Sequence, residues 1–169
     1  MGQADFITGQ DLREMFAAAT GWLEKSASDI DALNVFPVPD GDTGTNMLLT
    51  MRSAVEEAYQ SSDSGASGVA QAIAKGALIG ARGNSGVILS QIWNGLAQGL
   101  AEKERVTGSD LAPALQQASR GAYNGLSNPV EGTILTVIRE AASAAQAHTA
   151  TVSDDVISVM EATVGAAKE

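Results

Sequence analysis

The stretch Asn34-Val35-Phe36-Pro37-Val38-Pro39-Asp40-Gly41-Asp42-Thr43-Gly44-Thr45-Asn46 separates two apolar helical patterns. Its two prolines fix φ and remove two amide donors, which predicts a stiff, extended connector over 35–39 that belongs to neither a helix nor a central strand. Two carboxylates one residue apart follow directly, and an apolar helical run begins at Met47. The stretch is therefore predicted to bring concentrated negative charge to the start of a helix.

The alternation of Asp40, Gly41 and Asp42 allows both carboxylates to face one space, because glycine admits turns and close approaches that a Cβ would forbid. Oxygen ligands of this kind suit Mg²⁺, which takes one or two carboxylates together with substrate phosphates. A turn in which an aspartate caps the following helix explains the same residues and stays open as an alternative. An EF-hand does not fit, because its required glycine would fall on Thr45 and its closing glutamate on Met51.

A second glycine-rich loop spans residues 80–86, with the sequence GARGNSG, between two helical patterns. Its glycines expose backbone amides, and Asn84 or Ser85 can stand at the next helix N-terminus, where free N–H groups favour an anion. The loop is not a Walker A motif, because no Lys-Ser/Thr pair follows. A plain helix–helix turn remains the alternative. The residues predicted to form a phosphate cradle are Gly83, Asn84, Ser85 and Gly86.

Five further residues are candidates for the same site. Thr43, Thr45 and Asn46 follow the aspartates and can contact phosphate oxygens or bound water, and Arg82 can offset charge in a transition state, although a solvated arginine is an equal alternative. Thr133, in the loop Val130-Glu131-Gly132-Thr133, either caps the helix expected to begin at Ile134 or lies near the ligand.

The composition limits the class of protein. The 169 residues allow one domain with a good core, and the 44% hydrophobic content contains no apolar run long enough for a membrane span. The absence of cysteine excludes disulfides, and the N-terminus lacks a signal-peptide pattern, so a cytoplasmic location is expected. The net charge of −10 disfavours nucleic acid as a partner. A polyanionic ligand must then be received through metal ions and local amides.

Good helix formers dominate, aromatic residues are only 4%, and β-branched alternation is scarce, so the sequence predicts an all-α fold. Short loops predict antiparallel neighbours in a bundle of about seven or eight helices. Trp22 falls in an apolar stripe expected to face the core, and His148 is expected at the surface. Helices are expected over 11–26, 46–60, 69–80, 86–103, 111–126, 134–146 and 152–168, with a short helical or turn segment at 29–33.

Three strings occur in a fixed order: NVFPVPDGDTGTNM at 34–47, ARGNSGVILSQ at 81–91 and VEGTIL at 130–135. With them the chain resembles the DhaL-type (DAK2) nucleotide-binding domain of the dihydroxyacetone kinase superfamily, most closely the N-terminal domain of bacterial fatty acid kinases. The resemblance implies an up-and-down helical barrel with the three loops gathered at one end around ATP. It also implies that Asp40 and Asp42 hold the Mg²⁺ ions, two of them, that bridge the phosphates, with Asn34 near the place of a further family aspartate.

The resemblance implies an ATP-dependent kinase. The γ-phosphoryl group would pass to a fatty acid carboxylate held by a partner fatty-acid-binding protein, giving an acyl phosphate. A dihydroxyacetone kinase subunit and a non-catalytic helical binding module are the alternatives. Family domains continue past the last helix, so residues 1–169 are expected to be a C-terminally truncated piece of a longer kinase that can bind ATP yet be inactive alone. Any homodimer would form through the rest of that protein.

Overall fold

The computed structural model describes residues 5–35 and 39–169. Within these ranges the regular secondary structure is helical, apart from one antiparallel bridge between Ile7 and Val106. The all-α prediction is confirmed. The connector predicted over 35–39 falls mostly on residues 36–38, which lie outside the described residues. The helices are α1 (Gly9–Ala32), α2 (Thr43–Gln60), α3 (Ala66–Gly80), α4 (Gly83–Gly99), α5 (Gly108–Asn124), α6 (Ile134–Thr151) and α7 (Val156–Ala167).

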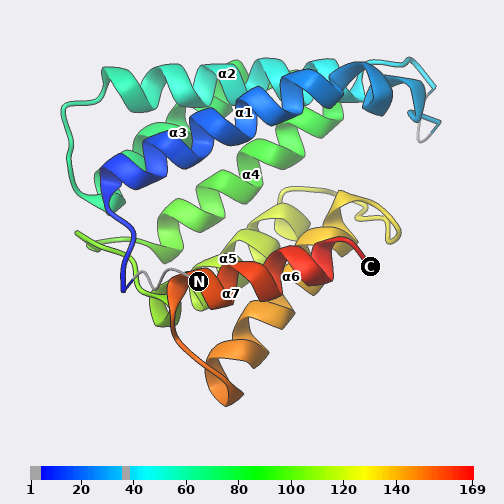
Figure 1. The fold of residues 1–169 in the computed structure, drawn as a ribbon. Helices are drawn as coiled ribbons and strands as arrows, with labels where there is room; N and C mark the ends of the chain where they lie inside the picture. Colours follow the sequence, from blue (N-terminus) through cyan, green and yellow to red (C-terminus); the bar gives the residue numbers. More distant parts are fainter. Residues whose placement is uncertain (1–4, 36–38) are drawn as a thin grey trace.

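Successive helices run in opposite directions and each packs against the next (Figure 1). Because the direction alternates, α2, α4 and α6 all begin at the same end of the bundle, at the right of Figure 1. The predicted up-and-down antiparallel bundle is confirmed. Among the described residues no Cα of α1 lies within 8 Å of a Cα of α7, so the bundle stays open between the backbones of these two helices. An apolar cavity of about 230 Å³, lined in part by Met15, Phe16 and Met160, borders this opening.

The helix starts follow from capping. Thr8 with Asp11 and Thr107 with Asp110 form capping boxes at the starts of α1 and α5. Thr133, predicted as a possible cap, does cap α6, and Asp155 caps α7. α1 continues to Ala32, so the separate segment expected at 29–33 is mostly its last turn. Both α2 and α4 begin three residues earlier than predicted, which places loop residues of the candidate site inside their first turns.

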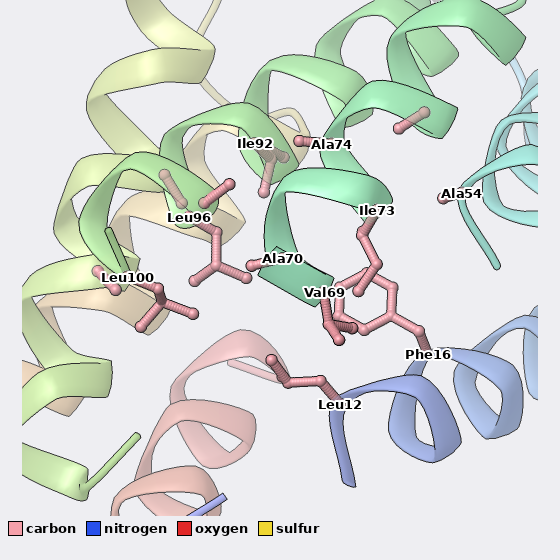
Figure 2. Close-up of a cluster of buried hydrophobic side chains, with 14 of the residues drawn as sticks. Leu12, Phe16, Ala54, Val69, Ala70, Ile73, Ala74, Ile92, Leu96 and Leu100 are labelled. Carbon is pink, nitrogen blue, oxygen red and sulfur yellow. The ribbon is translucent and has the colours of Figure 1, made fainter. Parts of the chain in front are cut away.

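The core centres on α3, whose Val69, Ala70 and Ile73 lie between side chains of α1 and α4 (Figure 2). Many buried positions are alanine, and Ala54, Ala58, Ala77, Ala118 and Ala122 are fully buried. Small residues let the helices approach closely. A Cβ on Gly76 of α3 would lie 2.4 Å from the Ser53 carbonyl oxygen of α2, so these two helices pack tightly. Across the described residues, no helix combines the length and the apolarity that a bilayer crossing needs.

Two expectations about single side chains are wrong. Trp22 is 74% exposed. It follows the buried Phe16 by six residues, which turns it about 120° away from that side chain around the helix axis. His148 is half-buried, and its Nε2 lies 2.6 Å from Ser158 Oγ, so it joins α6 to α7 rather than standing free at the surface.

The side chain of Arg13, on α1, donates hydrogen bonds to carbonyl oxygens at and just beyond the C-terminal end of α2. Its Nε donates to Ala58 O at 2.8 Å and its Nη2 donates to Ser61 O at 3.2 Å and also to Asp63 O. We expect Arg13→Met to lower the free energy of unfolding by about 1–2 kcal/mol, because methionine keeps the apolar stem and loses every donor. Urea unfolding measures the change. Arg120, which bonds Gln117 on its own helix, is the control, and an equal loss in Arg120→Met would contradict the assignment.

Candidate functional site

A cleft of about 480 Å³ opens at the end of the bundle where α2, α4 and α6 begin. All three predicted loops contribute to it, although they are far apart in the sequence. Its polar lining consists of Thr43, Asn84, Ser85, Asn128 and Thr133. Its apolar lining consists of Met47, Ile88, Leu126, Val130 and Ile134. Sequence reasoning missed the apolar half and Asn128, because helical periodicity does not distinguish a cleft wall from a core.

The first turn of α4 offers free amides to this cleft. Gly83 opens the helix with φ of +56°, and Arg82 at the N-cap provides no side-chain cap. The first backbone hydrogen bond at the N-terminal end of α4 is donated by Gly86 N to Arg82 O at 3.0 Å. The amides of Gly83, Asn84 and Ser85 therefore have no acceptor within the helix, which is the arrangement that binds phosphate at helix N-termini.

Gly86, the last residue of the predicted cradle, has a packing role. It is buried, and a Cβ there would lie 2.4 Å from Thr50 Oγ1 of α2. The same Thr50 hydroxyl oxygen accepts a hydrogen bond from Arg82 N at 3.3 Å. Since the Gly86 amide is bonded within the helix, we leave it out of the anion site.

Asn46 connects the first turns of α2 and α4. A Cβ on Gly83 would lie 2.3 Å from Asn46 Nδ2, so the side chain of Asn46 lies directly against the start of α4. The guanidinium of Arg82 is exposed, and its Nη1 donates to Ala81 O at 2.9 Å. The stretch 34–46 and the loop 80–86 are therefore neighbours in space.

The predicted metal ligands lie just before α2. Asn34 Nδ2 donates to Asp40 Oδ1 at 2.7 Å, and Asp42 occupies the N-cap of α2 without making a side-chain cap bond. This leaves the Asn34 carbonyl oxygen, one Asp40 oxygen and the Asp42 carboxylate as hard donors. Within the described residues, no three acidic or histidine side chains gather closely enough to hold a metal ion alone. The donors present suit Mg²⁺, which completes its coordination with water and substrate phosphate.

Asp31, near the C-terminal end of α1, was not predicted from the sequence. Thr45 N donates to Asp31 Oδ1 at 3.1 Å and Thr45 Oγ1 donates to Asp31 Oδ2 at 2.7 Å. The Thr45 hydroxyl lowers the pKa of Asp31 below its ordinary value of 3.8, and the backbone amides of Thr45 and Gly44 act in the same direction against a partial opposing effect of burial. Thr45, expected to contact phosphate, is thus bonded to α1 and is not part of the cleft lining.

The third loop is held by a polar network around Glu131. Tyr123 Oη donates to Glu131 Oε1 at 2.8 Å, Thr136 Oγ1 donates to Oε2 at 2.6 Å, and Arg139 Nη1 lies 2.7 Å from Oε2. The Thr136 hydroxyl, followed by that of Tyr123, lowers the pKa of Glu131. Thr136 Oγ1 also accepts from Gly132 N at 2.8 Å. The network therefore holds Glu131 and Gly132 in place, and the next residue, Thr133, lines the cleft.

Thr133 has the first of its two predicted roles, that of a helix cap. Its hydroxyl oxygen accepts from Leu135 N at 3.3 Å and its hydroxyl donates to Val130 O at 2.7 Å, so it caps α6 and closes the loop. It also lines the cleft.

A family model for the DAK2 domain matches residues 37–169. The chain belongs to the DAK2 domain family. This is a nucleotide-binding domain family of the kinase superfamily. The DAK2 domain described here is 48% identical over 139 residues to Protein YloV of Bacillus subtilis (strain 168), an alignment that covers 82% of this chain and 25% of that protein.

Two uncharacterized staphylococcal proteins are similar over nearly the whole DAK2 domain. One from Staphylococcus haemolyticus (strain JCSC1435) is 41% identical over 163 residues, which are 96% of this chain and 29% of that protein. One from Staphylococcus aureus (strain USA300) is also 41% identical over 163 residues, 96% of this chain and 30% of that protein. The chain therefore spans between 25% and 30% of the length of these relatives.

The cleft of this DAK2 domain divides into two chemical halves. The polar half offers the amide and hydroxyl groups of the asparagine, serine and threonine residues, the apolar half offers aliphatic side chains, and Asp40 and Asp42 are not part of the lining. A nucleotide presents the same division, because its phosphates need donors and cations while its base needs an apolar surface. The volume of the cleft lies in the range of small-molecule sites.

Proposed function

We propose that this DAK2 domain binds ATP with Mg²⁺ in the cleft and serves as the nucleotide-binding part of a kinase. The acceptor we propose is a fatty acid carboxylate held by a partner fatty-acid-binding protein, and the product is an acyl phosphate. The observation that supports the ATP site is that the uncapped start of α4 lies against Asn46 of α2 and shares one cleft with Thr43, the residue directly after Asp42. The likeness of the three loop motifs to fatty acid kinases supports the acceptor.

The phosphates are proposed to lie at the starts of α2 and α4. The amides of Gly83, Asn84 and Ser85 are free to donate to them, and the hydroxyl of Thr43 lines the same part of the cleft. Helix N-termini also carry about half a unit of positive charge each. The protein can therefore attract an anion locally in spite of its net charge of −10. The base is proposed to lie against the aliphatic half of the cleft.

The cation is proposed to be held by Asp40 and Asp42, with Asn34 supplying a neutral oxygen. Two Mg²⁺ ions bound here would neutralise charge on the terminal phosphates. The residues of the chain then hold and orient the nucleotide, which is most of what phosphoryl transfer requires of a protein. Arg82, one residue before the free amides, can offset charge as the transfer proceeds. An acceptor carboxylate is already ionised near neutral pH, so no general base is needed.

The rest of the kinase belongs to the same proposal. We propose that residues 1–169 form a single domain of a longer cytoplasmic enzyme, because relatives are about three to four times its length. The partner that carries the acyl chain, and any homodimer contact, would then involve parts of the protein beyond this domain.

Calorimetric titration with ATP, with and without Mg²⁺, tests the site. We expect ATP binding to require Mg²⁺, and Asp40→Ala or Asp42→Ala to weaken Mg²⁺-dependent binding by about 100-fold, because each removes a carboxylate ligand. Asp154→Ala, which removes an exposed aspartate just before α7 at the other end of the bundle, is the control and should bind as the parent does. Binding that ignores both the metal and the two aspartates would instead favour a non-catalytic binding module.

A further inference from the structure

We infer that Asp31 is a positioning residue for the metal-binding loop: it caps α2 from the end of α1 and so leaves the carboxylate of Asp42 free to bind a cation. The inference rests on the proposed function, because it requires Asp42 to be a Mg²⁺ ligand. It adds a residue that touches neither nucleotide nor metal, and it gives a structural reason why an N-cap aspartate can serve as a ligand.

The N-cap of α2 departs from the usual arrangement. An aspartate at the N-cap normally accepts a hydrogen bond from the amide two or three residues later. Asp42 occupies the N-cap with φ of −125° and ψ of 5°, outside the extended conformation usual at this position, and its side chain makes no cap bond. The amide three residues later is that of Thr45, and it donates to Asp31 Oδ1 at 3.1 Å. A carboxylate from another helix therefore makes the bond that an N-cap side chain usually makes.

Asp31 is held firmly in this role. Its second oxygen accepts from Thr45 Oγ1 at 2.7 Å, so both of its oxygens bind the same residue and fix the orientation of the carboxylate. The two helices are also in direct contact beside it, because a Cβ on Gly44 would lie 2.3 Å from Ala27 O. α1 therefore provides a rigid support for the first turn of α2.

The same end of α1 also orients the other proposed carboxylate ligand. Asn34, three residues after Asp31, donates from Nδ2 to Asp40 Oδ1 at 2.7 Å. Asn34 thus holds the carboxylate of Asp40 directly, and Asp31 leaves the carboxylate of Asp42 without a capping bond. A carboxylate that caps its own helix would have to break that bond in order to bind a metal ion, at a cost of about 1 kcal/mol. With Asp31 in place, this competition does not arise.

Removing Asp31 should turn Asp42 into the cap. In Asp31→Ala the amide of Thr45 loses its acceptor, and Asp42 at the N-cap is the side chain placed to replace it. We expect the Mg²⁺ concentration for half-maximal ATP binding to rise about tenfold, in the range seen for residues that orient metal ligands. ATP binding without Mg²⁺ should stay as weak as in the parent. Asp31→Asn, which keeps a carbonyl oxygen as acceptor, should restore most of the Mg²⁺ affinity.

The measurement is a calorimetric Mg²⁺ titration at fixed ATP, accompanied by thermal unfolding without ligands. A purely structural role for Asp31 would lower the melting temperature and leave the Mg²⁺ midpoint at the parental value, which would overturn the inference. If Asp31→Ala does not fold, Thr45→Val removes only the hydroxyl bond and should shift the midpoint about threefold; an unshifted midpoint there overturns the inference equally. A crystal structure of Asp31→Ala should show an Asp42 oxygen within hydrogen-bond distance of Thr45 N.

Failure of the proposed function gives a different result. If Asp42→Ala abolishes Mg²⁺-dependent binding and Asp31→Ala leaves it intact, the ATP site stands and only the inference falls. If the parent protein binds ATP without regard to Mg²⁺, the metal site itself is wrong, and the role of Asp31 falls with it.

Discussion

Gly83→Val is expected to weaken Mg²⁺-ATP binding by at least about 100-fold while the bundle still folds. Gly83 has φ of +56°, a region that a β-branched residue rarely adopts. Its new side chain would also need the space of Asn46, because even a Cβ would lie 2.3 Å from Asn46 Nδ2. Relief of either conflict moves the amides of Asn84 and Ser85 away from the cleft. Calorimetry with Mg²⁺-ATP gives the loss of affinity.

Gly21→Val is the matched control for this prediction. Gly21 lies within α1, and nothing would come within 4 Å of a Cβ there. The control variant should bind Mg²⁺-ATP as the parent does. Parental affinity in Gly83→Val would show that the start of α4 is not the phosphate site, and the proposed placement of the nucleotide would have to be abandoned.

Gly44→Val is expected to cause the largest loss of stability, about 3 kcal/mol or more. A Cβ at this position would lie 2.3 Å from Ala27 O and 2.9 Å from Ala27 C and Cα. These are backbone atoms, so no side-chain rotation relieves the overlap and α1 must separate from α2. The separation also breaks the bonds between Asp31 and Thr45. Urea unfolding at neutral pH measures the change in the free energy of unfolding.

The Gly21→Val variant again provides the comparison, because it adds the same side chain to one of the same two helices. Its unfolding free energy should stay within about 1 kcal/mol of the parental value and rise rather than fall, because valine has a higher helix propensity than glycine. Similar losses at Gly44 and Gly21 would mean that the contact between α1 and α2 tolerates expansion, and the tight crossing described above would be wrong.

Helical periodicity and short loops were sufficient to predict the bundle. The shared site of the three loops was implied by the family resemblance, and the alternating directions of the helices explain why the loops before α2, α4 and α6 lie at one end. Thr43, Asn84, Ser85 and Thr133 do line one cleft. The predicted family is confirmed by the match to the DAK2 domain. The roles assigned to the individual residues stay predictions.

The features that could not be predicted depend on contacts between distant segments. Asp31 caps a helix other than its own, so no local pattern marks it. Glu131 bonds Tyr123, Thr136 and Arg139 from two helices, and its loop alone does not reveal these partners. The early starts of α2 and α4 have a similar cause. Local capping rules expect a side chain just before a helix, whereas α4 begins with no side-chain cap and α2 takes its cap from α1.

The abundance of buried alanine and glycine has a consequence for how the interior responds to mutation. Alanine has almost no side chain left to remove, so truncation leaves only small voids at positions such as Ala54 or Ala118, which are fully buried. Enlargement is different, because a Cβ added at Gly44, Gly76 or Gly95 would lie only 2.3–2.5 Å from a backbone oxygen of the neighbouring helix. Most of the damaging substitutions in this interior should therefore be additions of volume, the reverse of an interior built from leucine and phenylalanine.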